Sequence, residues 1–345
     1  MRAFCVSIFF AAAAVAQTYT VQNSSTAENL RGVSAPSAKV IWASGTHGTF
    51  LRSSDGGTSW HEAKVPGAAD LDFRDVEAFD DKMAYLLSAG PGEKSRIYKT
   101  TDGGKSWELQ FTNKEPKGFF DCMAFWDRER GIAVGDPVDG KFELITTDDG
   151  GKNWKAIPPD SLPPAHEGEG AFAASGTCIA VNGKSDIWFA TGGPVARVFH
   201  SSDSGKNWIV ADTPIVHGAD STGIFSIAFR DAQHGVIAGG DYKQPGKSGP
   251  NLAFTDDGGA TWKLAAVSPQ WYFSVATFDR EAGGVFVAGS SRAAVLADPH
   301  AKSWRGTWDL SLNAATYCSA TRIMAVGPQR LTAIFALSEQ ESGPK

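Results

Sequence analysis

The sequence predicts an all-β fold made of a repeated four-stranded unit, and two periodic features support this prediction. The first is an octapeptide with five intact copies and one degenerate copy: "SSDGGTSW" (53–60), "TTDGGKSW" (100–107), "TDDGGKNW" (147–154), "SSDSGKNW" (201–208), "TDDGGATW" (255–262) and "ADPHAKSW" (297–304). The second is a short apolar segment ending in glycine, with seven copies: "KVIWASG" (39–45), "AYLLSAG" (84–90), "GIAVG" (131–135), "IWFATG" (187–192), "GVIAGG" (235–240), "VFVAG" (285–289) and "IMAVG" (323–327). Repeats of roughly 40–55 residues with several short strands each are typical of propeller blades.

The octapeptide is predicted to be a structural turn and not a site. Its aspartates can accept hydrogen bonds from nearby backbone N–H groups; they are Asp55, Asp102, Asp149, Asp203 and Asp257. The last glycine of each copy provides the positive φ of a tight turn, and the tryptophan covers the turn with apolar surface. A catalytic carboxylate occurs once or twice in a protein, so five copies at one position of the repeat indicate a hairpin scaffold.

Each repeat is predicted to contain four strands, lettered A to D, with the octapeptide between C and D. The last repeat ends after "LTAIFAL" (331–337) without a fourth strand, and "TYTVQNSS" (18–25) is an unassigned strand near the N-terminus. Pairing these two segments would close the ring and remove two open sheet edges. We therefore predict a single domain, residues 17–345, that is a seven-bladed β-propeller of four-stranded blades closed by an N-terminal strand. The expected blades span about 27–67, 68–115, 116–160, 168–214, 221–267, 270–310, and 312–338 together with 18–25.

The N-terminus, "MRAFCVSIFFAAAAVAQ", has the pattern of a signal peptide: Arg2, an apolar run, and Ala14-Val15-Ala16 as a small-residue cleavage site. The run is too short to span a bilayer. We expect residues 1–16 to be removed and the mature chain to be a periplasmic or secreted monomer without a transmembrane anchor. The formal net charge is −6, so the composition predicts no basic surface for nucleic acid.

Three cysteines follow the predicted signal peptide: Cys122, Cys178 and Cys318. Cys122 and Cys178 occupy similar places in neighbouring repeats, and an oxidising compartment would permit a bridge between them. The alternative is that all three are small buried apolar residues. The spacing alone leaves both interpretations open.

The octapeptide is similar to the Asp-box, or bacterial neuraminidase (BNR) repeat, of sialidases, some endoglucanases and sortilin-type receptors. An exported chain of this length with seven repeats, an N-terminal closing strand and "TDGGKSW"-type turns resembles the photosystem II assembly/stability factor family over residues 18–337. The resemblance implies a non-enzymatic lumenal or periplasmic propeller that binds a protein partner, a membrane-protein subunit, during assembly.

Propellers usually bind ligands where the D-to-A and B-to-C loops converge, on the face opposite the octapeptides. We call this the loop face. The residues expected there are Arg74, Asp75, Asp121, Asp136, Glu169, His217, Asp220, Asp241, Tyr242, Trp271, Tyr272 and Arg292. The acidic majority predicts a negative potential that attracts a basic peptide, with the aromatic residues as anchors. The alternative is a polar rim that is simply solvated.

The rival functional hypothesis is a glycoside hydrolase, sialidase-like or of another carbohydrate-active class, with Asp136 and Asp241 as acid and base. The Arg-Ile-Pro stretch of sialidases does not occur in the sequence. Nor do the motifs G-x-S-x-G, H-E-x-x-H and C-x-x-C, and no G-x-G-x-x-G opens a helix. The sequence therefore predicts no cofactor and no metal site, and it favours a binding protein over an enzyme.

Overall fold

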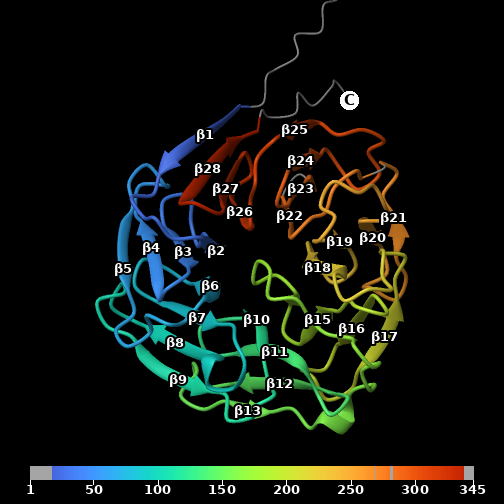
Figure 1. Ribbon diagram of the computed structural model, residues 1–345, viewed down its shortest axis with the longest axis horizontal. Helices are drawn as coiled ribbons and strands as arrows, with labels where there is room; N and C mark the ends of the chain where they lie inside the picture. Colours follow the sequence, from blue (N-terminus) through green and yellow to red (C-terminus); the bar gives the residue numbers. More distant parts are fainter. Residues whose placement is uncertain (1–17, 268, 280–282, 338–345) are drawn as a thin grey trace, which may run out of the picture.

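The computed structural model describes residues 18–267, 269–279 and 283–337 of the 345-residue chain. These residues form seven antiparallel sheets of four strands, which Figure 1 shows as a ring around a central axis. The predicted all-β, seven-bladed propeller is therefore confirmed. The predicted signal peptide, residues 1–16, lies outside the described residues.

In blades 1 to 6 the strands pair in chain order, from strand A near the ring axis to strand D at the periphery (Figure 1). Blade 1 contains β2 (Leu30–Ser34), β3 (Ile41–Gly45), β4 (Thr49–Ser53) and β5 (His61–Lys64). Blade 2 contains β6 (Phe73–Ala78), β7 (Ala84–Ser88), β8 (Arg96–Thr100) and β9 (Glu108–Thr112). Blade 3 contains β10 (Phe120–Phe125), β11 (Gly131–Val138), β12 (Lys141–Thr147) and β13 (Lys155–Ala156). Blade 4 contains β14 (Ile179–Asn182), β15 (Asp186–Ala190), β16 (Arg197–Ser201) and β17 (Ile209–Asp212).

The remaining blades repeat this order. Blade 5 contains β18 (Thr222–Phe229), β19 (Gly235–Asp241), β20 (Leu252–Thr255) and β21 (Lys263–Leu264). Blade 6 contains β22 (Val275–Phe278), β23 (Val285–Ala288), β24 (Ala293–Leu296) and β25 (Gly306–Trp308). Blade 7 contains β26 (Ala314–Ser319), β27 (Arg322–Val326) and β28 (Leu331–Ala336), with β1 (Thr18–Asn23) as its fourth strand. Two short 3-10 turns, η1 (Gly92–Lys94) and η2 (Pro159–Ser161), lie in connections on the loop face.

The N-terminal strand closes the ring as predicted. β1 runs antiparallel to β28, with Thr18 opposite Ala336 and Asn23 opposite Leu331 (Figure 1). The hydroxyl of Thr332 donates a 3.0 Å hydrogen bond to the Gln22 carbonyl oxygen. Strand β28 therefore has a partner on both sides, and the last blade is made from both ends of the propeller.

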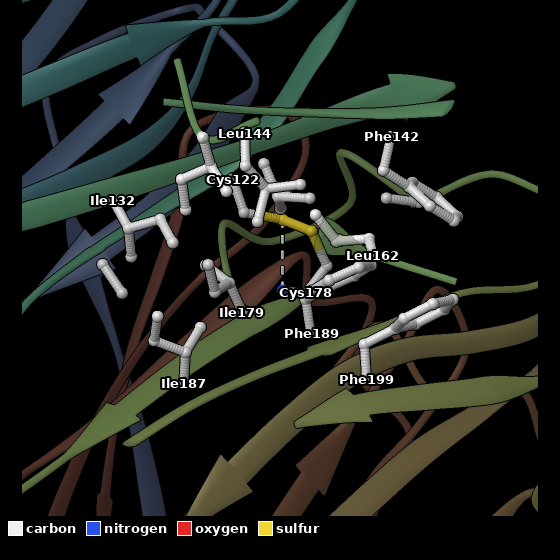
Figure 2. Packing of buried hydrophobic residues seen from close by; sticks show 14 of the residues in the cluster. Cys122, Ile132, Phe142, Leu144, Leu162, Cys178, Ile179, Ile187, Phe189 and Phe199 are labelled. Carbon is white, nitrogen blue, oxygen red and sulfur yellow. Dashed lines mark hydrogen bonds between the residues drawn. A yellow bond between two sulfur atoms is a disulfide. The ribbon is translucent and has the colours of Figure 1, made fainter. Parts of the chain in front are cut away.

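The hydrophobic core is divided into clusters between adjacent blades, because the B and C strands of each sheet bury both faces. Figure 2 shows the cluster between blades 3 and 4, where the Phe142 ring meets Phe189 at 5.2 Å and Phe199 at 5.1 Å between centroids. The continuous burial of β3 and β7 explains why these segments contain no charged residue and are apolar except for one buried serine each. The core thus holds neighbouring blades in a fixed angular relation, which keeps their loops in place.

The recurring octapeptides form the C-to-D turns, opposite the loop face. In the blade 2 copy, Asp102 Oδ1 accepts a 2.9 Å hydrogen bond from the Ser106 N–H, and the Thr100 hydroxyl accepts one from the Gly104 N–H, also at 2.9 Å. The other four intact copies repeat both bonds. Gly104 has φ +83°, and a Cβ there would lie 2.5 Å from the Phe50 ring of blade 1. Each turn therefore also packs against the preceding blade.

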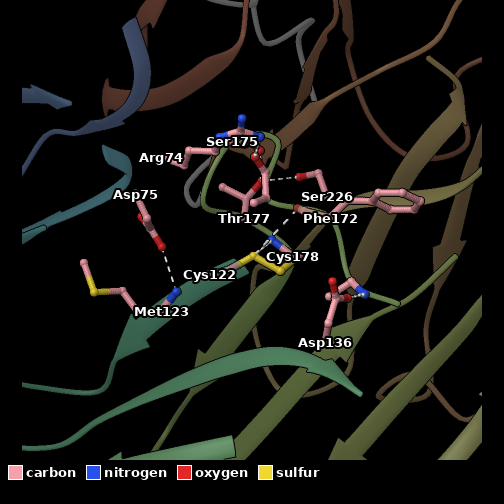
Figure 3. The surroundings of a disulfide bond; sticks show 12 residues. Arg74, Asp75, Cys122, Met123, Asp136, Phe172, Ser175, Thr177, Cys178 and Ser226 are labelled. Carbon is pink, nitrogen blue, oxygen red and sulfur yellow. Dashed lines mark hydrogen bonds between the residues drawn. A yellow bond between two sulfur atoms is a disulfide. The ribbon is translucent and has the colours of Figure 1, made fainter. Parts of the chain in front are cut away.

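A disulfide joins Cys122 of β10 to Cys178, the residue before β14, so it links blades 3 and 4 (Figures 2 and 3). Both cysteines are fully buried within the cluster between these blades. The cysteine spacing left two interpretations open, and the structure contains the disulfide. Cys318 is the third cysteine; it is buried and not bridged.

Candidate functional site

A segment between blades 3 and 4, residues 171–177, lies at the centre of the ring (Figures 1 and 3). We call it the central segment. Its backbone and hydroxyl groups are bound by four other blades. Asp136 Oδ1 in blade 3 accepts a 3.0 Å hydrogen bond from the Ala171 N–H, and Arg74 Nη1 in blade 2 donates a 3.0 Å bond to the Ala173 carbonyl.

On its other side the central segment contacts blades 5 and 6. The Ser175 hydroxyl donates a 2.7 Å hydrogen bond to the Ser274 carbonyl, and the hydroxyls of Thr177 and Ser226 are 2.7 Å apart. The disulfide at Cys178 fixes the end of the segment. Because five anchors hold these few residues, the central segment is a rigid wall and not a free loop.

One cavity on the loop face lies beside this wall, with a volume of about 750 Å³. We call it the acidic pocket. Its charged residues are Asp136, Asp139, Glu167, Glu169, Asp220, His166 and Lys117, and its floor contains Gly140, Gly168, Gly170, Gly192 and Gly193. Gly170 and Gly192 exchange backbone N–H···O bonds, and the Gly193 N–H donates to the Thr222 carbonyl, so these backbone groups bind one another and hold the pocket in shape. Lys117 pairs with Asp139 at 3.2 Å, so Asp136, Glu167 and Asp220 supply the excess negative charge.

A second cavity of about 490 Å³ lies on the other side of the central segment and shares Phe172 with the acidic pocket. We call it the arginine–aromatic pocket. Its lining includes Arg31, Arg74, Phe172, Phe225, Tyr242, Tyr272, Ser274 and Asn313. The Phe172 and Phe225 rings stack with their centroids 3.9 Å apart, and the Tyr272 ring meets Phe225 edge-on at 4.8 Å. The two pockets thus differ in both charge and polarity.

The inner strands explain how these side chains reach the second pocket. Blades 1, 2, 3 and 5 have a β-bulge near the start of strand A, at Arg31, Arg74, Asp121 and Phe225. Each bulged residue follows a buried apolar residue, and a bulge redirects the side chain of the residue that it leaves unpaired. Ser274 and Asn313 follow buried apolar residues in the same way in blades 6 and 7. Of these residues, Arg31, Arg74, Phe225, Ser274 and Asn313 line the arginine–aromatic pocket, and Asp121 does not.

Three carboxyl groups beside the central segment have raised pKa values. Burial raises the pKa of Asp136 to about 6 and that of Asp75 well above its ordinary value. Burial and the nearby Asp136 charge raise the pKa of Asp121, against the opposing effect of Arg74. Asp121 Oδ2 is buried and, among the described residues, has no hydrogen-bond partner, which suits a protonated carboxyl.

Several of the expected site residues have hydrogen-bond partners within the protein. Asp75 is 5% exposed and its Oδ2 accepts a 2.7 Å hydrogen bond from the Met123 N–H (Figure 3). Glu169 is 4% exposed and pairs with Arg197, which donates to both carboxylate oxygens. Asp241 accepts bonds from its own loop, at Lys243 N and Gln244 Nε2. All three carboxylates are thus held by internal contacts, and Glu169 also lines the acidic pocket.

The remaining expected residues lie around the rim. Asp220 lines the acidic pocket, and Tyr242 and Tyr272 line the arginine–aromatic pocket. His217 is exposed and its Nδ1 lies 2.8 Å from the Ile215 carbonyl oxygen. Arg292 lies over the Trp271 ring at 4.5 Å and pairs with Asp309. Neither Trp271 nor Arg292 belongs to the lining of the two pockets.

Arg31, Phe172 and Phe225 line the second pocket but were not among the residues expected from the sequence. Arg31 and Arg74 occupy the same position in "LRGV" and "FRDV", so an alignment of the inner strands identifies them together. Phe172 lies outside the repeat, in an inserted connection, and no periodic signal identifies it. Within the described residues, no group of three or more His, Cys, Asp or Glu side chains could hold a metal ion, and no helix could cross a membrane.

Sequence and structure comparisons both point to propellers. No family model matches the chain. The chain is 25% identical over 255 residues to the photosystem II assembly lipoprotein Ycf48 of Synechococcus sp. (strain CC9902), a match that covers 72% of this chain and 65% of that protein. It is 28% identical over 157 residues to the vacuolar protein sorting/targeting protein 10 of Colletotrichum graminicola (strain M1.001 / M2 / FGSC 10212), covering 43% of this chain and 10% of that protein. The chain thus matches less than two thirds of the length of either relative.

The solved structures give the same architecture. YCF48 from Cyanidioschyzon merolae superposes with a TM-score of 0.65 at 18% identity, covering 92% of this chain and 98% of that one. The structure of U3-55K also superposes with a TM-score of 0.65, at 12% identity, covering 92% of this chain and 98% of that one. These likenesses establish the seven-bladed fold, and the sequence match shows that the chain is similar to a photosystem II assembly factor.

Proposed function

We propose that this chain is an exported, non-enzymatic propeller that binds a protein partner at its loop face and serves as an assembly scaffold. The observation that supports this most is the pair of unlike pockets on the two sides of one rigid central segment. A preformed and chemically varied surface on a rigid scaffold suits recognition of a chain segment. The similarity to an assembly lipoprotein favours the same kind of role.

In this proposal the octapeptides are Asp-box repeats with a structural task. Their aspartates are engaged in turn hydrogen bonds on the face away from both pockets. Residues 1–16 act as the signal peptide, and sequencing the N-terminus of the protein recovered from a periplasmic fraction tests this. A chain that still begins at Met1 and is recovered from the cytoplasmic fraction contradicts export.

The acidic pocket gives the partner its first chemical feature, a basic side chain. Asp136, Glu167 and Asp220 line one cavity, and only Lys117 and His166 oppose them there. Low-dielectric walls strengthen the attraction between such carboxylates and an incoming ammonium or guanidinium group. Glu169 adds no free charge, because Arg197 neutralises it. The partner segment therefore presents Lys or Arg to this pocket.

The test measures the binding of a fluorescent lysine-containing peptide to the wild type and to Asp136→Asn/Asp220→Asn at low and at physiological ionic strength. The association rate should fall with salt in the wild type and change less in the variant. Asp148→Asn is the matched control, because Asp148 is an exposed octapeptide residue on the opposite face. A wild-type rate that is independent of salt and equal to that of the double variant contradicts the proposal.

The single variant Asp136→Asn distinguishes the binding protein from a glycoside hydrolase. A carboxyl with a raised pKa in a cavity is also the feature of a general acid. If the chain hydrolyses any member of a panel of fluorogenic glycosides and Asp136→Asn abolishes turnover, the chain is an enzyme. The other candidate carboxylate, Asp241, accepts hydrogen bonds on both oxygens within its own loop.

A further inference from the structure

The guanidinium of Arg31 lines the arginine–aromatic pocket with one of its nitrogens unsatisfied. Its Nε is buried and has no hydrogen-bond partner among the described residues. Arg74, the neighbouring cation in the same pocket, is held by Asp72 at 2.9 Å and by the Ala173 carbonyl. Burial and then the like charge of Arg74 lower the pKa of Arg31. Arg31 is partly buried and the nearby Asp72 charge compensates it only in part, so an unsatisfied Nε costs free energy that an anionic ligand offsets.

The walls of the pocket restrict which anion fits. Phe172, Phe225 and Tyr272 surround the arginines, and Tyr242 is 46% exposed at the rim. A heavily hydrated anion such as a free phosphate would lose its water against these rings. A carboxylate on an apolar body suits them better, because the planar carboxylate pairs with a guanidinium and its hydrocarbon part packs on the aromatic rings.

The position of the two pockets links this anion to the basic group of the partner. Both cavities are lined by Phe172, on the two sides of the central segment. A peptide that crosses this wall therefore places neighbouring residues in an acidic and in a basic environment. Nucleic acid fits poorly, because its phosphates would meet Asp136, Glu167 and Asp220 next to the arginines.

We propose, building on the function proposed above, that the arginine–aromatic pocket binds a carboxylate attached to an apolar group, and that the partner segment carries this carboxylate close to a basic side chain. The loop face thus binds a segment that carries both a carboxylate and a basic side chain, and not a uniformly basic segment. Opposite charges in a fixed order also orient the segment, because the reversed peptide places each charge in the repelling pocket. The carboxylate comes from a chain terminus or from an acidic side chain beside an apolar residue.

The experiment uses a series of N-acetylated peptides with one lysine, an increasing number of glycine spacers and a final phenylalanine. Each peptide is made with a free terminal carboxylate, as the terminal amide, with Asp before the phenylalanine amide, and with norleucine in place of lysine. Binding is measured by calorimetry to the full-length mature protein, to Arg31→Gln and to Arg31→Lys. Arg128→Gln is the control, because Arg128 is an exposed arginine that pairs with Asp80 away from both pockets.

We expect at least one spacer length to bind the free acid more tightly than the amide by about tenfold to a hundredfold, the usual effect of one hydrogen-bonded charge. This preference should disappear in Arg31→Gln, be partly kept in Arg31→Lys and be unchanged in Arg128→Gln. The loss of affinity that follows from replacing lysine with norleucine should persist in Arg31→Gln, because the lysine binds in the acidic pocket. Tight binding of the Asp–Phe amide identifies a side chain as the source of the carboxylate, and its absence identifies a terminus.

Equal binding of acid and amide, with the lysine still required, overturns the carboxylate proposal and leaves the proposed function in place. Binding that depends on neither the lysine nor the carboxylate, or that no spacer length produces, overturns both. The melting temperature of Arg31→Gln must be close to that of the wild type, which shows that the variant is folded. If it unfolds, the comparison of acid with amide on the wild type and on Arg31→Lys decides the question.

Discussion

Asp136 Oδ1 accepts a 3.0 Å hydrogen bond from the backbone N–H of Ala171. This single bond connects the second strand of blade 3 to the central segment, while the same carboxyl lines the acidic pocket. Asp136 thus takes part both in the charge of one pocket and in the position of the wall that the two pockets share. Its protonation state therefore affects binding and stability together.

The first prediction concerns pH. Burial raises the pKa of Asp136 to about 6, above the value of about 4 expected in the unfolded chain. The folded state therefore holds the proton more tightly, and the free energy of unfolding should decrease as pH rises from about 4 to about 6. Asp75 and Asp121 act in the same direction. Urea unfolding of wild type and Asp136→Asn across this range measures the effect, and the variant should show a shallower slope. Identical slopes would show that Asp136 titrates normally.

The second prediction concerns the contact between an octapeptide and the preceding blade. Gly104→Ala places a methyl group 2.5 Å from the Phe50 ring, at φ +83°. Overpacking and the unfavourable φ should together reduce the free energy of unfolding by about 2–4 kcal/mol. Gly140→Ala is the matched control, because Gly140 has φ +81° with no atom within 4 Å of the added Cβ. If both variants lose the same stability in urea unfolding, backbone strain accounts for the effect and the packing argument fails.

The third prediction separates the turns from the binding site. The Ser106 hydroxyl and N–H, followed by the Thr100 hydroxyl, lower the pKa of Asp102 to about 2 by hydrogen bonding to its carboxylate. Asp102→Ala should lower the melting temperature at neutral pH and leave peptide binding unchanged. Because the folded pKa is lowered, this stabilisation is present above pH ~4 and is lost as pH falls towards ~2, so the difference from wild type should shrink in acid. Loss of binding by a folded Asp102→Ala protein would instead move the site to the octapeptide face.

The ring itself was predictable because the repeat is periodic and the missing fourth strand could be counted. The positions of the carboxylates were less predictable. Asp121 is itself the bulged residue of blade 3, whereas Asp75 follows the bulged residue of blade 2, Arg74. Such a shift changes the direction in which the following side chains point. The sequence pattern of an inner strand does not indicate where the bulge falls.

The connection between blades 3 and 4 was the least predictable part of the site. Glu169 was expected to face a ligand, but Arg197, which lies 28 residues later in another strand, holds it in a buried pair. The hydroxyls of Ser175 and Thr177 likewise find partners in blades 5 and 6. These contacts depend on how the insertion crosses the ring, which no local propensity encodes. Together these contacts hold the central segment in place between the two pockets.

The fourth prediction concerns the disulfide. Cys122 and Cys178 are 56 residues apart in sequence and bridge two blades beside the central segment. Replacing both with Ser should reduce the free energy of unfolding by about 2–4 kcal/mol, the usual contribution of a structural bridge. Cys318→Ser leaves the bridge in place and controls for the loss of a buried thiol. If the double variant unfolds at the same urea concentration as wild type under oxidising conditions, the bridge does not stabilise the ring.

The last prediction concerns closure by the N-terminal strand. Removing the chain up to Thr26 leaves β28 with an unpaired edge and uncovers the Phe335 ring, on which Tyr19 stacks at 5.6 Å. The truncated protein should melt at a lower temperature, by about 2–4 °C for each kcal/mol lost, and should associate through the open edge. A synthetic peptide of residues 18–26 should restore the melting temperature in a concentration-dependent way, because it binds only the folded ring. A peptide with the same residues in scrambled order is the control. An unchanged melting temperature after truncation, or equal rescue by the scrambled peptide, would show that blade 7 does not need β1 to remain closed.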